Sequence, residues 1–321
     1  MAIISKDLSL AKSLLENSQL VAIPTETVYG LAGNALDSLA VASIFETKKR
    51  PSFDPLIVHV ASIDKAESYC SEFPEPLGRL AEAFWPGPLT LLLPKTAQIP
   101  DLVTSGLDRV AIRVPNHPQT LALLYSLDFP LAAPSANPFG YISPTTPEHV
   151  NAQLGMYIPM ILDGGPCEVG LESTIVGMEG DQLIIYRLGG LAIDAIEAVV
   201  GKVMIRDHSS SNPQAPGLLE SHYAPKTPFV LGDLEVLIPA YLERGDSFAV
   251  LSLCDKWDLI SNSRQLILSK KSDLKEAAAS LFSHMRLLDE QKVAVILAEL
   301  MPEIGLGKAI NDRLKRASAK S

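Results

Sequence analysis

Short apolar segments alternate with helix-like segments along most of the chain, and this alternation constrains the fold more than any other feature of the sequence. Apolar residues recur at helical spacing within Asp7–Leu15, and the run Leu20–Ile23 then has the composition of a buried strand. A second helix at Leu39–Phe45 must end before Pro51, because proline disfavours helical geometry in the residue that precedes it. Further strand candidates are the runs 55–60, 89–93, 110–114 and 131–133. The pattern predicts an α/β fold.

One segment, from Arg206 to Pro225, is polar, rich in helix breakers and without periodicity, which is typical of a linker or a functional loop. We therefore expect a first domain at residues 1–205, a linker at 206–226 and a second domain at 227–321. In the second domain, Ser272 is expected to cap a helix with one apolar face. Strand candidates surround that helix at 248–253, 265–268 and 293–297. This order predicts a small βαβ unit.

The charge balance argues against several functions. The 321 residues include 27 Lys and Arg against 37 Asp and Glu, a formal net charge of −10, which disfavours broad, sequence-independent binding of nucleic acid. No apolar run is long enough for a membrane span, and the first residues lack the pattern of a signal peptide, so we expect a cytoplasmic protein. Cys70, Cys167 and Cys254 are far apart and form no Cys-x-x-Cys, which indicates reduced thiols rather than disulfides or a zinc site.

Polar residues follow the first predicted strands. If the segment Pro24–Leu31 is extended, Thr25, Thr27 and Tyr29 share one face and could bind a small polar ligand. On its own, the run Lys48–Pro51 is better explained by favourable pairing of its cations with the end of a helix than by a binding site. A histidine inside an apolar strand, as His59 is, is usually part of the core.

The strand candidate Arg109–Val114 carries a stronger signal. Arg109 and Arg113 would project from the same face about 13 Å apart with only Ala111 between them, which favours an anion receptor. Ser135 and Asn137, two residues apart after another apolar strand, could contact one polar group together. The usual glycine-rich phosphate-binding motifs are missing from the sequence. A triphosphate would therefore have to be held by cationic side chains.

Six motifs in order resemble the YrdC-type threonylcarbamoyl-AMP synthases. They are Pro24-Thr-Glu-Thr-Val-Tyr-Gly-Leu31, Lys48-x-Arg-Pro-x-x-x-Pro-Leu-Ile-Val-His59, Trp85-Pro-Gly-Pro-Leu-Thr90, Ala111-Ile-Arg-Val-Pro115, Ala132-Ala-Pro-Ser-Ala-Asn137 and Glu172-Ser-Thr-Ile175. Two later motifs resemble the longer form of that family, which has an additional C-terminal domain. They are His222-Tyr-Ala-Pro225 and Gly305-Leu-Gly-Lys-Ala-Ile-Asn-Asp-Arg313.

The resemblance implies a fold and an activity. The fold would be an open, twisted, mixed sheet with flanking helices, followed by a smaller Rossmann-like α/β domain. The enzyme would join L-threonine, bicarbonate and ATP into L-threonylcarbamoyladenylate with release of pyrophosphate, and Mg²⁺ would accompany the nucleotide. A separate tRNA threonylcarbamoyl transferase complex would consume the adenylate, so stable direct binding of tRNA is not expected. The linker would fold over the cleft as a lid.

The resemblance also implies site residues. Lys48 and Arg50 would act in catalysis, and Asp54 stands where many relatives carry Asn. The residues expected to hold threonine are Thr27, His59, Arg113, the backbone around Ala133, and Ser173. Those expected to hold ATP are Lys48, Arg50, Asp54, Arg109, Ser135, Asn137, Ser143, Arg187 and Tyr223.

Two other functions are alternatives. An RNA-binding module could use a cationic cavity to hold a phosphodiester, although the net charge weighs against it. A carbamoyltransferase of the hydrogenase-maturation kind would carry zinc-binding cysteine pairs and an acylphosphatase-like segment, and this sequence has neither.

Overall fold

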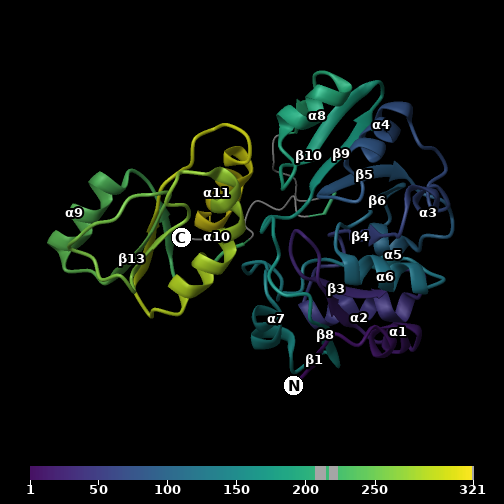
Figure 1. Ribbon diagram of the computed structural model, residues 1–321, viewed down its shortest axis with the longest axis horizontal. Helices are drawn as coiled ribbons and strands as arrows, with labels where there is room; N and C mark the ends of the chain where they lie inside the picture. Colours follow the sequence, from purple (N-terminus) through teal and green to yellow (C-terminus); the bar gives the residue numbers. More distant parts are fainter. Residues whose placement is uncertain (207–214, 217–222, 320–321) are drawn as a thin grey trace.

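The computed structural model describes residues 1–206, 215–216 and 223–319. His222 and most of the predicted linker, including its expected closure as a lid, lie outside these residues. The described chain forms two lobes, each built on its own sheet (Figure 1). No helix in these ranges is both long and apolar enough to cross a membrane.

The larger lobe contains a twisted sheet of 11 strands in the order β1-β8-β2-β3-β7-β4-β6-β5-β9-β10-β11. Parallel pairs such as β4 with β6 and antiparallel pairs such as β4 with β7 occur side by side, as the resemblance implied for a mixed sheet. The strands are β1 (Ile3–Ser5), β2 (Val21–Ile23), β3 (Gly30–Asn34), β4 (Ile57–His59), β5 (Leu89–Pro94), β6 (Arg109–Arg113), β7 (Leu131–Ala132), β8 (Met160–Leu162), β9 (Thr174–Glu179), β10 (Gln182–Arg187) and β11 (Met204–Ile205).

Eight helices of the described chain flank this sheet. They are α1 (Leu8–Glu16), α2 (Ser38–Lys48), α3 (Ile63–Glu67), α4 (Glu75–Phe84), α5 (Asp101–Thr104), α6 (Pro118–Ser126), α7 (Pro147–Leu154) and α8 (Ile193–Val200). The side chain of Asp7 caps α1 by accepting a hydrogen bond from the Leu10 amide. Helix α2 ends at Lys48, and the next residue, Lys49, adopts a left-handed conformation with φ of 52° shortly before Pro51.

The two faces of the sheet are packed differently. On β2, Ala22 belongs to the main core, whereas Val21 and Ile23 point to the opposite face and pack in a cluster with residues of α1 and α6. On that second face, a further small cluster contains strand residues together with Ala215 of the linker. This part of the sheet carries the cavity described below.

The smaller lobe is built on four parallel strands in the order β12-β15-β13-β14. Its elements are β12 (Phe229–Leu231), α9 (Leu234–Arg244), β13 (Phe248–Ser252), β14 (Gln265–Ile267), α10 (Leu274–Asp289), β15 (Val295–Ala298) and α11 (Gly307–Ser318). Asp273, rather than the predicted Ser272, caps α10. The predicted cap is wrong because Ser272 has a φ of 56°, whereas a cap residue usually has extended geometry.

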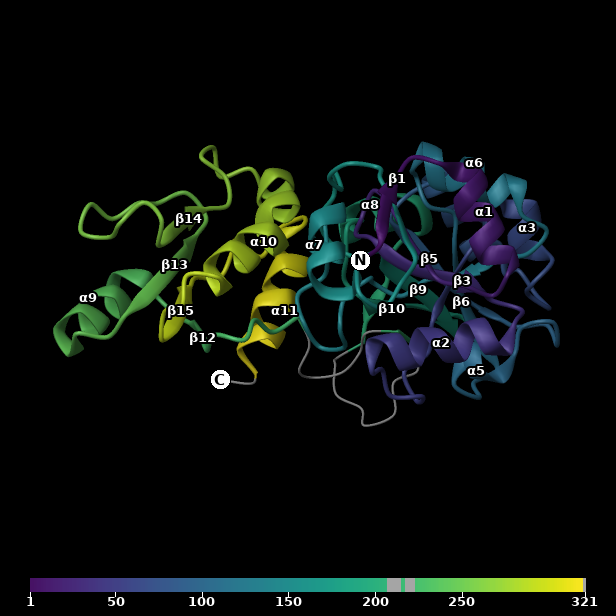
Figure 2. The ribbon, with the colours of Figure 1, turned by 90° about the horizontal axis from the view of Figure 1, so that it is seen from below.

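Helices α10 and α11 lie between the small sheet and the larger lobe, and α9 lies on the far side (Figures 1 and 2). Val28, Ile142 and Leu171 of the larger lobe belong to the same apolar cluster as the buried residues of α10 and α11. At Gly170, with φ of +74°, an added Cβ would lie only 2.5 Å from the Cα of Ala279. The lobes are therefore in close backbone contact there.

Candidate active site

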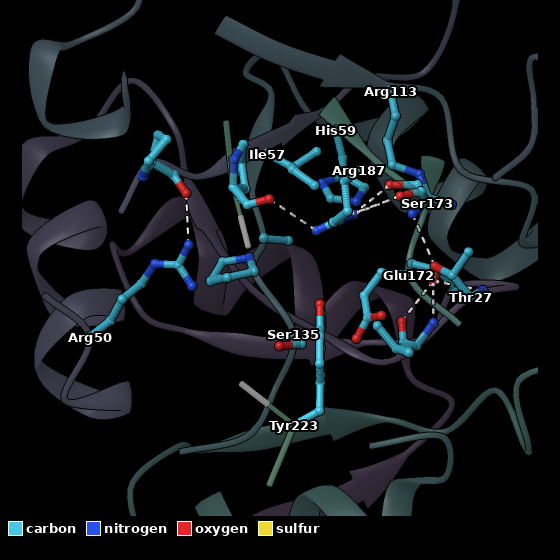
Figure 3. A pocket seen from close by; sticks show the side chains of 17 residues that line it. Thr27, Arg50, Ile57, His59, Arg113, Ser135, Glu172, Ser173, Arg187 and Tyr223 are labelled. Atoms are coloured by element: carbon cyan, nitrogen blue, oxygen red, sulfur yellow. Dashed lines mark hydrogen bonds between the residues drawn. The ribbon is translucent and has the colours of Figure 1, made fainter. Parts of the chain in front are cut away.

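A cavity lies on the sheet face opposite the main core, with Arg50 on one side, Arg113 on the other and Arg187 between them (Figure 3). It contains most of the residues that the sequence predicted. These are Thr27, Arg50, His59, Arg113, Ala133, Ser135, Ser173, Arg187 and Tyr223. The remaining wall is formed by Thr25, Val28, Gly30, Pro55, Ile57, Pro134, Glu172 and Pro216.

Arg113 is the last residue of β6, and the sheet register places it beside His59 of β4. Its guanidinium is buried and donates to Thr27 Oγ1 at 3.0 Å and to Glu26 Oε1 at 2.6 Å. Its Nε has no acceptor among the described residues. A guanidinium held on one side and still able to donate is suited to binding a carboxylate.

His59 is buried in the same corner of the cavity. Burial, together with the neighbouring Arg113 cation, lowers the pKa of its imidazole to about 3. The ring is therefore neutral at physiological pH. Its Nδ1 makes no hydrogen bond within the described part of the chain. A neutral imidazole can contact a zwitterion without adding a second charge next to the arginine.

The pKa of His59 predicts a pH dependence of stability. The unfolded chain binds a proton below the ordinary pKa of 6.5, whereas the folded chain does so only near 3, so stability is lost as pH falls through this interval. As pH is lowered, we expect the free energy of unfolding of the parent to fall faster than that of His59→Gln. The two slopes should differ by up to roughly 1.4 kcal/mol per pH unit. Urea unfolding of both proteins at several pH values between about 7 and 4.5 measures this. A constant difference between the two proteins would contradict it.

The segment after β2 forms a turn rather than the extended strand considered from the sequence. Thr25 Oγ1 bonds the carbonyl of Val28 at 2.7 Å and the hydroxyl of Thr27 at 2.7 Å, so the chain folds back on itself. Thr25 and Thr27 line the cavity, but the hydroxyl of Tyr29 donates to the carbonyl of Gly165 at 2.8 Å. The predicted three-hydroxyl edge is therefore wrong, because the turn separates Tyr29 from the two threonines.

Arg50 follows the end of α2 and is held by a buried carboxylate. Its Nη2 lies 2.9 Å from Asp54 Oδ2, and its guanidinium also donates to the carbonyls of Asp54 and Pro55. Asp54 itself does not line the cavity. Its acidic side chain therefore orients Arg50 from behind instead of facing a ligand.

Arg187, at the end of β10, joins the floor of the cavity to the linker. It donates to the Ser173 carbonyl from Nε at 3.1 Å and from Nη2 at 2.8 Å, and to the carbonyl of Pro216 at 3.4 Å. Burial lowers its pKa to about 10, so it remains a cation at neutral pH. No carboxylate of the described residues forms a salt bridge with it.

Lys48 lies behind the cavity wall. Its buried ammonium donates to the carbonyls of Ser135 and Asn137, both at 2.5 Å, and burial lowers its pKa. The Asn137 amide in turn donates to the carbonyl of Tyr141 at 2.8 Å. Ser135 lines the cavity and Asn137 does not. In this geometry Lys48 fixes the backbone that presents Ser135.

Arg109 and Arg113 do not form the common anion receptor that their spacing predicted. Arg109 donates to the Tyr186 hydroxyl at 2.9 Å and to the Met178 carbonyl at 3.2 Å, away from the cavity. Between the two arginines, Ala111 packs in the small cluster that includes Tyr186 and Ala215. Arg113 lines the cavity, whereas Arg109 does not, and an apolar cluster surrounds the alanine between them.

Three charged residues near the cavity were not among the predicted site residues. Glu26 pairs with Arg113, and Glu172 lines the wall, where it accepts from Ser143 Oγ at 2.5 Å. Ser143, a predicted ATP contact, does not line the cavity itself. The Nε of Arg313, in α11, donates to Glu172 Oε2 at 2.9 Å. All three residues lie inside the family motifs, and this position could have indicated that they belong to the site.

The described residues offer no protein cage for a metal ion. They contain no group of three His, Cys, Asp or Glu side chains placed to hold one. The one carboxylate that lines the cavity there, Glu172, is already bound by Ser143 and Arg313. We therefore assign no protein ligand to Mg²⁺, which commonly binds nucleotide phosphates and water instead.

Comparisons with known proteins identify the family. A family model described as telomere recombination, Sua5–YciO–YrdC, matches residues 13–189. A second one, described as the C-terminal domain of threonylcarbamoyl-AMP synthase, matches residues 191–319.

Whole-chain relatives cover both lobes. Threonylcarbamoyl-AMP synthase of Bacillus subtilis is 40% identical over 96% of this chain and 92% of its own length. The crystal structure of Sua5 from Pyrococcus abyssi complexed with L-threonine has a TM-score of 0.91 and 38% identity, covering 98% of this chain and 96% of that one. The chain belongs to the threonylcarbamoyl-AMP synthase family.

Proposed function

We propose that this protein uses ATP to convert L-threonine and bicarbonate into L-threonylcarbamoyladenylate with release of pyrophosphate. Whole-chain identity to curated threonylcarbamoyl-AMP synthases supports this function. The observation that carries it is one cavity in which a buried Arg113 beside a neutral His59 faces Arg50 and Arg187. Such a cavity suits an amino acid next to a phosphorylated nucleotide.

In the proposed reaction, the amine of threonine and bicarbonate first form a carbamate and release water. A carbamate oxygen then forms a bond to the α-phosphorus of ATP while the bond to pyrophosphate breaks. The protein contributes mainly orientation and charge stabilisation, since the reactants supply all of the bonds. Arg113 would hold the threonine carboxylate, with Thr27, His59, Ser173 and the backbone at Ala133 around it.

The nucleotide would lie toward Arg50, Ser135, Arg187 and Tyr223. Lys48, Asp54, Asn137 and Ser143 would act behind the wall by holding these groups, and Arg109 would lie beyond the linker residue Ala215. Mg²⁺, when bound, would neutralise phosphate charge. These residue assignments are part of the proposal.

Other parts of the proposal concern the cellular context. A downstream tRNA threonylcarbamoyl transferase complex would consume the adenylate. A cytoplasmic location is in keeping with three unpaired cysteines, because disulfides are rare in reducing compartments. The whole-chain relatives support the synthase rather than the RNA-binding alternative.

We expect release of pyrophosphate to require threonine, bicarbonate and ATP together, because the carbamate is the nucleophile that attacks the nucleotide. A coupled phosphate assay with inorganic pyrophosphatase, run with each reactant omitted in turn, measures this. Mass spectrometry of the complete mixture should detect threonylcarbamoyladenylate. Unchanged pyrophosphate release without threonine would contradict the function.

A further inference from the structure

Glu172 is held on both of its carboxylate oxygens by groups from different lobes. Ser143 of the larger lobe donates to Oε1, and Arg313 of α11 donates to Oε2 at 2.9 Å. Arg313 is fully buried, with 0% of its surface exposed. A buried carboxylate of the cavity wall is thus paired with a cation that does not line the cavity.

Arg313 also meets the linker residue that lines the cavity. Its guanidinium carbon lies 4.9 Å from the ring centroid of Tyr223, and Arg313 Nη2 donates to the Leu188 carbonyl at 2.8 Å. Tyr223 also packs on Phe282 of α10, with ring centroids 5.6 Å apart, and the guanidinium carbon of Arg316 lies 4.7 Å from the same ring. Two elements of the cavity wall, Glu172 and Tyr223, are therefore fixed by the same arginine.

The local charges explain why this pairing matters. Burial raises the pKa of Glu172, but Arg313 and Arg187 outweigh that effect and keep the pKa below its usual range, so Glu172 is an anion. Arg187 and Arg313 are the two cations that influence it most. Arg316 is also buried nearby, but it pairs with Asp312, the second carboxylate partner of Arg313. If Arg313 were absent, Arg187 would therefore be the other cation that acts on Glu172, and it would be drawn away from a ligand in the cavity.

We propose that Arg313 is a positioning residue for the nucleotide: it neutralises Glu172 from outside the cavity and supports Tyr223, which leaves the charge of Arg187 available to phosphate. This inference rests on the proposed function. It gives the smaller lobe a defined electrostatic part in ATP binding, through a residue of the Gly305–Arg313 motif.

The test is a double-mutant cycle measured by threonine-dependent pyrophosphate release. We expect Arg313→Gln to raise the KM for ATP about tenfold or more and the KM for threonine less than about threefold, because Glu172 would then offset the charge of Arg187, which the proposal assigns to phosphate. In Glu172→Gln/Arg313→Gln no carboxylate of the cavity wall competes for Arg187, and Tyr223 still packs on Phe282 and Arg316. The KM for ATP should therefore return to within about threefold of the parent.

Arg286→Gln is the matched control. Arg286 is another buried arginine between the lobes, but it donates to the carbonyls of Ile142 and Ser143 and to Gln153, and to no carboxylate of the cavity. Adding Glu172→Gln to the Arg286→Gln variant should therefore not lower its KM for ATP. Equal recovery in both backgrounds would overturn the proposal, because it would show a general effect on the interface.

Two further outcomes decide the proposal. A folded Arg313→Gln protein whose KM for ATP stays within about twofold of the parent would overturn it. If Arg313→Gln does not fold, Glu172→Gln alone decides: the KM for ATP should stay unchanged or fall, and a rise of about fivefold or more would overturn the proposal. A parent protein without threonine-dependent activity would instead refute the proposed function, so the two failures are distinguishable.

Discussion

Arg113→Ala is expected to lower kcat/KM for threonine by about 100-fold or more, because a buried, charge-assisted contact with the substrate carboxylate would be lost. The substitution also removes the partner of Glu26, whose Oε1 lies 2.6 Å from Arg113 Nη2. The uncompensated Glu26 would then repel the carboxylate of threonine. Initial rates of pyrophosphate release at varied threonine concentration measure the effect.

Two variants control this experiment. Arg113→Lys keeps the charge but cannot fork between Thr27 and Glu26, so it should retain part of the activity lost in the alanine variant. Arg244→Ala removes an exposed arginine at the end of α9, far from the cavity, and should leave the rate unchanged. Near-normal kcat/KM in a folded Arg113→Ala protein would show that the threonine site lies elsewhere.

Arg50→Ala should have an effect of similar size on ATP, lowering kcat/KM for the nucleotide by about 100-fold. It should also destabilise the protein by about 3–5 kcal/mol, because the buried carboxylate of Asp54 loses its ion pair. Varied ATP concentration in the pyrophosphate assay and urea unfolding measure the two effects.

Asp54→Asn separates activity from stability. In the double variant Arg50→Ala/Asp54→Asn no buried charge is left unpaired, so much of the lost stability should return while the activity stays low. If activity returned together with stability, Arg50 would be a structural residue only, and its assignment to the nucleotide would be wrong. Asp54→Asn alone keeps an acceptor for Arg50 and should therefore cost little activity.

Much of the fold follows from local sequence. The strand predicted at 110–114 is β6, and the helix that had to end before Pro51 is α2. Periodicity and the restrictions that proline imposes are local properties, so these elements could be predicted. The turn at Thr25–Val28 could not, because its hydroxyl bonds compete with the strand pattern over only a few residues.

The residues of the candidate site could largely be predicted from the sequence. Their ion-pair partners could be predicted less well. Family motifs indicated Arg113 and Arg50, and the structure places both in one cavity. The carboxylate partner of Arg113 was not predicted, because Glu26 is 87 residues from Arg113 along the chain. Contacts over such a separation depend on how the sheet and the lobes assemble, which single-sequence patterns do not contain. Strand alternation alone predicted that Arg109 shares a ligand with Arg113. It could not show that Arg109 instead contacts Met178 and Tyr186, which are distant along the chain.

The pairing of Glu172 with Arg313 has a consequence for synthesis of the protein. The two residues are 141 positions apart, so at about 5–20 residues per second a ribosome adds the arginine roughly 7–28 s after the glutamate. During that interval the nascent larger lobe cannot bury this carboxylate against its final counter-ion. We expect the nucleotide end of the cavity to mature last, after translation of α11, so unfinished chains should not sequester cellular ATP.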